Sequence, residues 1–215
     1  MIHAIGDSFT FGEELATQDL AWPSILSKRL NKEIINQGCP GTGNTRIVKR
    51  IIDAVSNKSD LVIAGWTECN RLEFADEIGI FDVWAGKNFS GTKWTGQGKD
   101  WTHRVNLIKY MTAYDTPEYH YVNWLRQIIL TQSLCKLHQI PCVMWISFGA
   151  NSLHKKYNAE HTKLVEQIDR SMFVQNSLLI NSMEWVNDAP LGPNGHPLEL
   201  GHRRIADKIY ASINR

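Results

Sequence analysis

The sequence has few cysteines, almost no net charge and no long apolar run, and each shortage argues against a class of protein. Its four cysteines, Cys39, Cys69, Cys135 and Cys142, form no CxxC pair, so neither a disulfide framework nor a zinc site is expected. No apolar stretch approaches the roughly 18–20 residues that span a bilayer, and the first residues do not resemble a signal peptide. Lys and Arg number 23 against 22 Asp and Glu, which leaves no field to attract nucleic acid or an anionic membrane. We therefore expect a cytoplasmic protein with neither a nucleic-acid nor a membrane partner.

The 215 residues, 43% hydrophobic and 21% charged, fit one soluble domain spanning residues 1–215. Apolar patterning predicts strands that alternate with helices, which is typical of an α/β protein, a three-layer α/β/α sandwich with a central parallel sheet. The predicted strands are 2–5, 33–36, 60–64, 142–146 and a weaker one at 178–180. One predicted helix starts at Trp22, and the others cover 45–56, 118–138, 160–173 and 199–214.

An aromatic-rich insert at about 72–116 interrupts this alternation. A long irregular segment inside a domain is often a functional lid or wall, and it can equally be a hydrophobic cluster that caps the sheet. Its tryptophans suit stacking on a sugar as well as lining an acyl pocket.

Polar and glycine-rich segments follow the predicted strands, where ligands collect in doubly wound sheets. The first strand ends in Gly-Asp-Ser at 6–8, the second leads to the loop 36–41, and the third ends in the segment 65–71. A further segment, 192–197, precedes the last helix and contains His196.

Ser8 lies on a predicted tight turn, where glycine permits a strained backbone and following amide groups can face an oxyanion. A serine hydroxyl is a poor nucleophile at neutral pH, so it needs an imidazole to accept its proton and donors to stabilise the oxyanion. Alone, Gly-Asp-Ser is more often a turn or helix cap. Together with the other segments in this order, it favours a catalytic serine.

These blocks resemble the SGNH (GDSL-like) hydrolases, whose ordered motifs are a Gly-Asp-Ser turn, a glycine, an asparagine and a late histidine. The resemblance covers the whole chain and implies a flavodoxin-like SGNH hydrolase fold with no metal or cofactor. It implies Ser8 as nucleophile and His196, which precedes a proline and the last helix, as base; His202, inside that helix, is expected to pack or cap.

For the oxyanion hole, the resemblance implies the Ser8 N–H, the Gly41 N–H and the Asn70 side chain. Gly41 is five residues past Asn36, the spacing usual in the family. The chain departs from the family's Gly-x-Asn-Asp block, so Thr67 is an alternative donor. The neighbouring Asp7, Trp66 and Arg71 are expected to bind substrate.

The larger departure concerns the acid that orients the histidine. The family usually has an Asp three residues before it, and this chain has Pro193 there. Asn194 or Asp188 is expected to take over the role; otherwise a Ser-His dyad or a weak enzyme results.

We therefore predict a serine esterase that cleaves a small-molecule or glycan ester, of short-chain or acetyl type, through an acyl-Ser8 intermediate. The alternative is a catalytically weak or silent domain of this fold that binds a carbohydrate or protein partner. A nucleotide-binding loop at 38–45 fits G-x-x-x-x-G-K-[ST] except that Asn44 replaces the lysine, which argues against it. HExxH and the G-x-S-x-G elbow are both absent.

Overall fold

The computed structural model describes residues 1–76, 79–84, 106, 110, 117–147, 159–178 and 180–214. The strands are β1 (Ile2–Gly6), β2 (Ile34–Gly38), β3 (Leu61–Trp66), β4 (Arg71–Asp76), β5 (Gly79–Trp84) and β6 (Cys142–Ile146). The α-helices are α1 (Ser8–Phe11), α2 (Trp22–Leu30), α3 (Asn44–Ser56), α5 (Pro117–Leu137), α6 (Ala159–Gln167), α7 (Ser182–Trp185) and α8 (Glu199–Ile213). Short 3-10 turns are η1 (Gln18–Leu20), η3 (Arg170–Met172) and η4 (Val174–Asn176).

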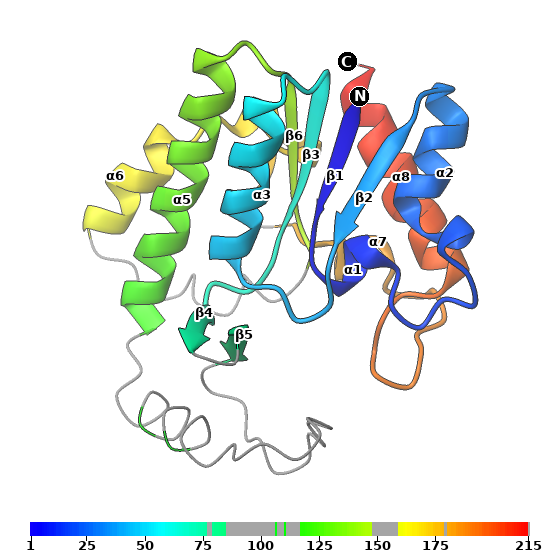
Figure 1. Cartoon of the computed structure of the whole chain (residues 1–215), viewed down its shortest axis with the longest axis horizontal. Coiled ribbons are helices and arrows are strands. Elements are labelled where there is room, and N and C mark those ends of the chain that lie inside the picture. Colours follow the sequence, from blue (N-terminus) through cyan, green and yellow to red (C-terminus); the bar gives the residue numbers. More distant parts are fainter. Residues whose placement is uncertain are drawn as a thin grey trace.

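The central sheet has the strand order β2-β1-β3-β6, and all neighbouring strands are parallel. Helices α3, α5 and α6 cover one face, while α2 and α8 cover the other (Figure 1). The predicted three-layer α/β/α fold is therefore confirmed. Because the strands are parallel, their carboxyl ends meet at one edge, where α1 begins after β1 (Figure 1).

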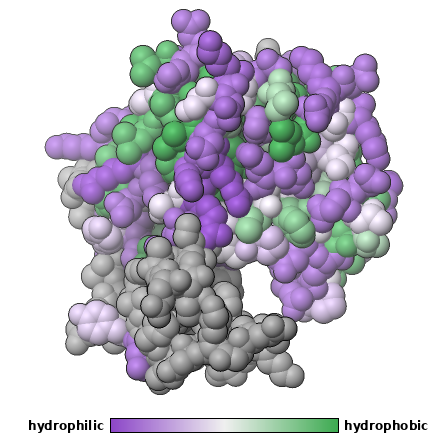
Figure 2. Space-filling model, viewed as in Figure 1, coloured by the Kyte–Doolittle hydropathy of each residue, from purple (hydrophilic) through white to green (hydrophobic). Residues whose placement is uncertain are grey.

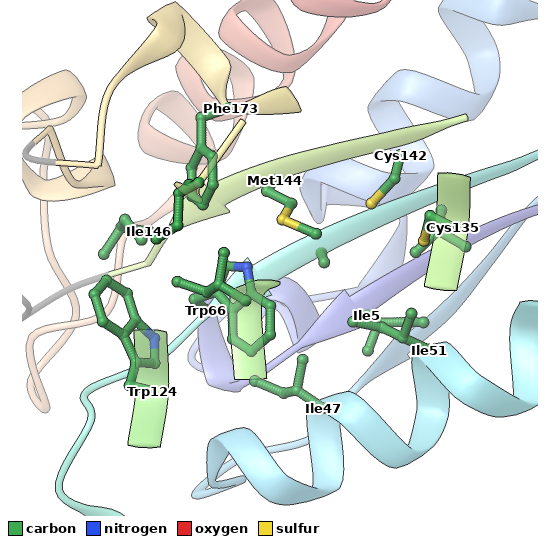
Figure 3. Packing of buried hydrophobic residues seen from close by; sticks show 14 of the residues in the cluster. Ile5, Ile47, Ile51, Trp66, Trp124, Cys135, Cys142, Met144, Ile146 and Phe173 are labelled. Carbon is green, nitrogen blue, oxygen red and sulfur yellow. The ribbon is translucent and has the colours of Figure 1, made fainter. Parts of the chain in front are cut away.

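Each face of the sheet has its own hydrophobic core, which explains why the strands are apolar at nearly every position. Along β3, Val62 and Ala64 pack toward α3 and α5, whereas Ile63 packs toward α2 and α8. The side facing α3 and α5 holds large side chains such as Trp66 and Trp124, shown in Figure 3. Both faces of β3 are therefore buried, and none of its side chains faces solvent.

Most predicted elements agree with the structure to within a few residues, and the prediction for 142–146 matches β6. The predicted strand at 178–180 is wrong for its described residues, Leu178 and Ile180, which belong to no strand. Among the described residues of this region, isolated parallel bridges join it to β6, from Met144 to Phe173 and from Ile146 to Asn181. The predicted helix 160–173 ends earlier, at Gln167, and a 3-10 turn follows.

The start of the aromatic-rich insert forms the antiparallel pair β4-β5, which is separate from the main sheet. Half of the insert's Phe, Trp and Tyr residues lie outside the described residues, so the lid and capping-cluster interpretations remain predictions. Figure 2 shows hydrophilic side chains over much of one face of the described part, interspersed with apolar areas. Among the described residues, we find no helix with the length and apolar character that crossing a bilayer requires.

Candidate active site

Ser8 is the first residue of α1, and a single residue, Asp7, separates it from the end of β1. The helix is capped by Asp7, whose Oδ1 accepts a hydrogen bond from the Phe9 N–H at 3.0 Å. Gly6 allows α1 to fold back closely on the strand, because a Cβ at this position would lie 2.2 Å from Thr10 Oγ1. The predicted tight turn at Ser8 is thus a capped strand-to-helix junction, and Ser8 is 3% exposed.

The base candidate His196 lies against this helix, although 188 residues of sequence separate it from Ser8. Its ring is edge-on to the ring of Phe9, with centroids 5.7 Å apart. His196 lies at the end of a tight loop in which the Gly195 N–H donates to Gly192 O at 2.9 Å. The Gly192 N–H in turn donates to His196 O at 2.8 Å, which closes the loop. The structure therefore brings the histidine to the residue that follows Ser8.

Two consecutive glutamates, which the sequence analysis did not single out, contact the two ring nitrogens of His196. Glu14 Oε2 lies 2.9 Å from Nδ1, and Glu13 Oε2 lies 3.3 Å from Nε2. The Glu14 side chain is 11% exposed and that of Glu13 is 37% exposed. Glu14 therefore has the shorter and more enclosed contact with the imidazole.

The Glu14 carboxylate is favoured in its ionised form. Burial acts to raise the pKa of Glu14, but hydrogen bonds from the Asn194 N–H and from the His196 ring and N–H outweigh it and lower the pKa. Glu14 also has a φ of 67°, in the left-handed region that non-glycine residues rarely adopt. Such backbone strain is kept when surrounding contacts determine the conformation, and it clusters at functional sites.

The two residues predicted to orient His196 have other partners. Asp188 pairs with Arg204, and its side chain is 72% exposed. The Asn194 side chain donates to Glu14 Oε1 at 3.1 Å, so Asn194 contacts the carboxylate and not the imidazole. The bonding of the ring thus differs from the prediction, because the Nδ1 contact comes from a glutamate near the N-terminus.

The candidate oxyanion residues lie on the loops that follow β2 and β3. Gly41 has a φ of 75°, and a Cβ there would meet no atom within 4 Å. Gly6 and Gly38 are paired in register, so the segments carrying Ser8 and Gly41 start side by side. Asn70 lies in a turn closed by a hydrogen bond from the Arg71 N–H to Glu68 O at 3.2 Å. Their roles as donors remain predictions.

Thr67 and Asn44 form a structural link between β3 and α3. The Thr67 N–H donates to Asn44 Oδ1 at 3.1 Å, and Asn44 Nδ2 donates to the carbonyls of Thr67 and Glu68 at 3.2 and 3.0 Å. The backbone N–H of Thr67 is therefore already used, so the predicted donation by Thr67 to the oxyanion would come from its hydroxyl, and this role remains a prediction. Asn44, at the lysine position of the nucleotide-loop pattern, is buried and committed to the same link.

The three residues predicted to bind substrate are buried, and Asp7 and Trp66 have structural contacts. Asp7 caps α1 and accepts a hydrogen bond from Ser147 at 2.7 Å. Trp66 is 0% exposed within the core that faces α3 and α5 (Figure 3). Arg71 is 7% exposed. The prediction of direct substrate contact is therefore wrong for Trp66 and Asp7, because packing and capping enclose their side chains.

His202 lies inside α8, as predicted, and acts as a cap for another helix. Its Nδ1 accepts a hydrogen bond from the Trp22 N–H at 3.2 Å, at the start of α2. Burial, together with the nearby His196, lowers the pKa of His202 to about 4. Within the described residues, no cluster of three or more His, Cys, Asp or Glu side chains is arranged to hold a metal ion.

Comparison with solved structures identifies the fold. A mutant of an acetyl-xylooligosaccharide esterase from Geobacillus stearmophilus matches with a TM-score of 0.54 and 14% identity, over 100% of this chain and 94% of the other. A lipolytic protein of the G-D-S-L family from Veillonella parvula matches with a TM-score of 0.50 and 14% identity, over 100% and 98% of the two chains. Neither the protein-family models nor the curated proteins give a match. The chain therefore has the α/β/α fold of the SGNH hydrolases.

Proposed function

We propose that the protein is a serine esterase in which Ser8 is the nucleophile and His196 the general base. The observation that carries this proposal is the packing of the His196 ring against Phe9, the residue after Ser8, at the carboxyl edge of the sheet. A strand-to-helix junction that presents a serine, with an imidazole beside it, is the arrangement that acyl transfer requires.

In the first half-reaction, the Ser8 hydroxyl attacks the ester carbonyl and its proton passes to Nε2 of His196. The carbonyl oxygen becomes an oxyanion, stabilised by the N–H groups of Ser8 and Gly41 and by Asn70. The carbon–oxygen bond to the alcohol then breaks, and His196 returns the proton to the departing oxygen. Water attacks the acyl-Ser8 ester by the same sequence, releasing the acid and restoring the hydroxyl.

Nε2 must be free of a proton to act as base. The Glu14 contact at Nδ1 favours this state, whereas the Glu13 contact at Nε2 opposes it. Neutral imidazole carries one N–H, which stays at Nδ1 because Glu14 lies closer there than Glu13 does at Nε2. The Nε2 lone pair then repels the Glu13 carboxylate. Glu13 is more than one-third exposed, so its side chain has room to turn toward solvent.

For the substrate, we propose an acetyl or other short-chain ester, with an ester on a carbohydrate as the preferred class. The fold neighbour that acts on acetyl-xylooligosaccharides supports this choice. The tryptophans of the insert offer flat apolar surfaces of the kind that stack on sugar rings.

The test is p-nitrophenyl acetate hydrolysis by the wild type, Ser8→Ala and His196→Ala, followed by a panel of acetylated glycans. We expect both substitutions to reduce kcat by at least about 10³-fold, as in other serine hydrolases. A phosphonate should add covalently to the wild type and not to Ser8→Ala, as measured by intact mass. Wild-type activity that survives undiminished in both variants would reject this site, and an inactive wild type would favour the non-catalytic binding domain.

A further inference from the structure

We propose that Glu14 is the carboxylate that orients His196, so that the acid of the catalytic triad comes from the segment just after the nucleophile helix. This inference rests on the proposed esterase function. It assigns to Glu14 the task that an Asp before the histidine performs in the resembling family, at the position where this chain has Pro193.

Five short contacts fix the carboxylate on the histidine loop. Oε1 accepts from the Asn194 N–H at 2.9 Å and from the Asn194 side chain at 3.1 Å. Oε2 accepts from the Asn194 and His196 N–H groups, both at 3.1 Å, and lies 2.9 Å from His196 Nδ1. Backbone N–H groups hold both carboxylate oxygens of Glu14 in place. The contact with Nδ1 therefore sets the orientation of the His196 ring, and the carboxylate does not simply follow the ring.

The loop is shaped to admit this side chain. A Cβ at Gly192 would lie 2.6 Å from both Cδ and Oε2 of Glu14, so any larger residue would occupy the space of the carboxylate. Glu14 itself adopts a φ of 67°, in the left-handed region that is unfavourable for a non-glycine residue. The unfavourable backbone of Glu14 and the space left by Gly192 together indicate that the surrounding structure holds this carboxylate in a defined position.

The chemical consequence concerns the tautomer of the imidazole. A carboxylate that accepts the Nδ1 proton leaves the lone pair on Nε2, the nitrogen that takes the proton of Ser8. When His196 becomes an imidazolium in the transition state, the negative charge of Glu14 stabilises it. Glu14 stays ionised throughout, which agrees with its lowered pKa.

The competing interpretation is that Glu14 only stabilises the loop, since it also accepts hydrogen bonds from backbone N–H groups of the loop. The two interpretations differ in what happens to the ring. A carboxylate that only holds the loop acts in the same way for either tautomer of His196. A carboxylate that orients the ring determines both the tautomer of His196 and the rate of catalysis.

The experiment compares Glu14→Gln with the matched control Asp188→Asn, which also removes one carboxylate in the same part of the fold. An amide donor at residue 14 favours the wrong tautomer, so we expect kcat on the alkaline plateau to fall by about 10³–10⁴-fold with little change in KM. The acid limb of the pH–rate profile should also move to lower pH, because the anion that stabilises the imidazolium is gone. Asp188→Asn should retain kcat.

A second measurement does not depend on catalytic activity. In wild-type protein labelled with ¹⁵N-histidine, NMR should show the neutral His196 ring protonated at Nδ1, and Glu14→Gln should change this pattern. A proton at Nε2 in the wild type, or full kcat in Glu14→Gln, would overturn the assignment of Glu14. Activity that persists in Ser8→Ala would instead overturn the proposed function, so the two failures are distinguishable.

Discussion

Replacing Gly192 by alanine should impair the proposed esterase activity. The substitution changes no charge, and Gly192 has no side chain of its own that contacts His196. A Cβ at residue 192 would lie 2.6 Å from the Glu14 carboxylate, whereas ordinary contact begins at 3.4 Å. Gly192 has no positive φ, so alanine suits its backbone and the steric conflict with Glu14 is the main effect.

The expected magnitude follows from how far the carboxylate must move. Reaching ordinary contact requires a displacement of about 0.8 Å, which is enough to break a hydrogen bond that starts near its optimal length. The contact between Glu14 and Nδ1 starts at 2.9 Å. A misplacement of about 1 Å in a catalytic group costs on the order of 10²-fold, so we expect kcat/KM to fall by about that factor.

The assay is a double-mutant cycle on p-nitrophenyl acetate with Gly192→Ala, Glu14→Gln and the double variant. If alanine acts by displacing the carboxylate, it should add little to the loss already caused by Glu14→Gln. Thermal unfolding of all four proteins separates displacement from loss of fold. Wild-type kcat/KM in Gly192→Ala, or full additivity of the two losses, would refute the reasoning.

Two further predictions concern stability. Trp66→Ala should lower the free energy of unfolding by about 3–5 kcal/mol in a urea titration, because Trp66 is fully buried; a loss below 1 kcal/mol would contradict its place in the core. His202 has a pKa of about 4 in the fold, below its unfolded value of roughly 6.5, so its contribution is complete above pH 6.5 and falls as the pH drops toward 4. Between pH 7 and 5 the wild type should lose roughly 2 kcal/mol more than His202→Gln, and equal losses would contradict this.

The sequence predicted the layers of the fold because its signals are local. Apolar runs such as 61–64 favour strands buried on both faces, and the structure shows β3 with a core on each side. The weak strand at 178–180 failed because three apolar residues do not distinguish a strand from a segment that merely packs on β6.

The histidine's partner was missed because its contact is tertiary. Glu14 and Asn194 are 180 residues apart, and no periodicity links them. One signal was present in the sequence: two glutamates follow the nucleophile motif in a chain whose usual acid position is Pro193. Trp66 was misassigned for a related reason, since a residue at a strand's carboxyl end faces either the site or the core, and only packing decides which.

Pro193, which stands where the family usually has the acid, also shapes the loop that binds Glu14. Gly192, Pro193, Asn194 and Gly195 form a turn closed by the hydrogen bond from the Gly195 N–H to Gly192 O at 2.9 Å. Proline is favoured at the second position of such turns, where its fixed φ lowers the entropy lost on ordering. The turn directs the N–H groups of Asn194 and His196 at Glu14. The loop 192–196 carries no acid of its own, and its backbone instead binds the carboxylate of Glu14, which lies close after the nucleophile in the sequence.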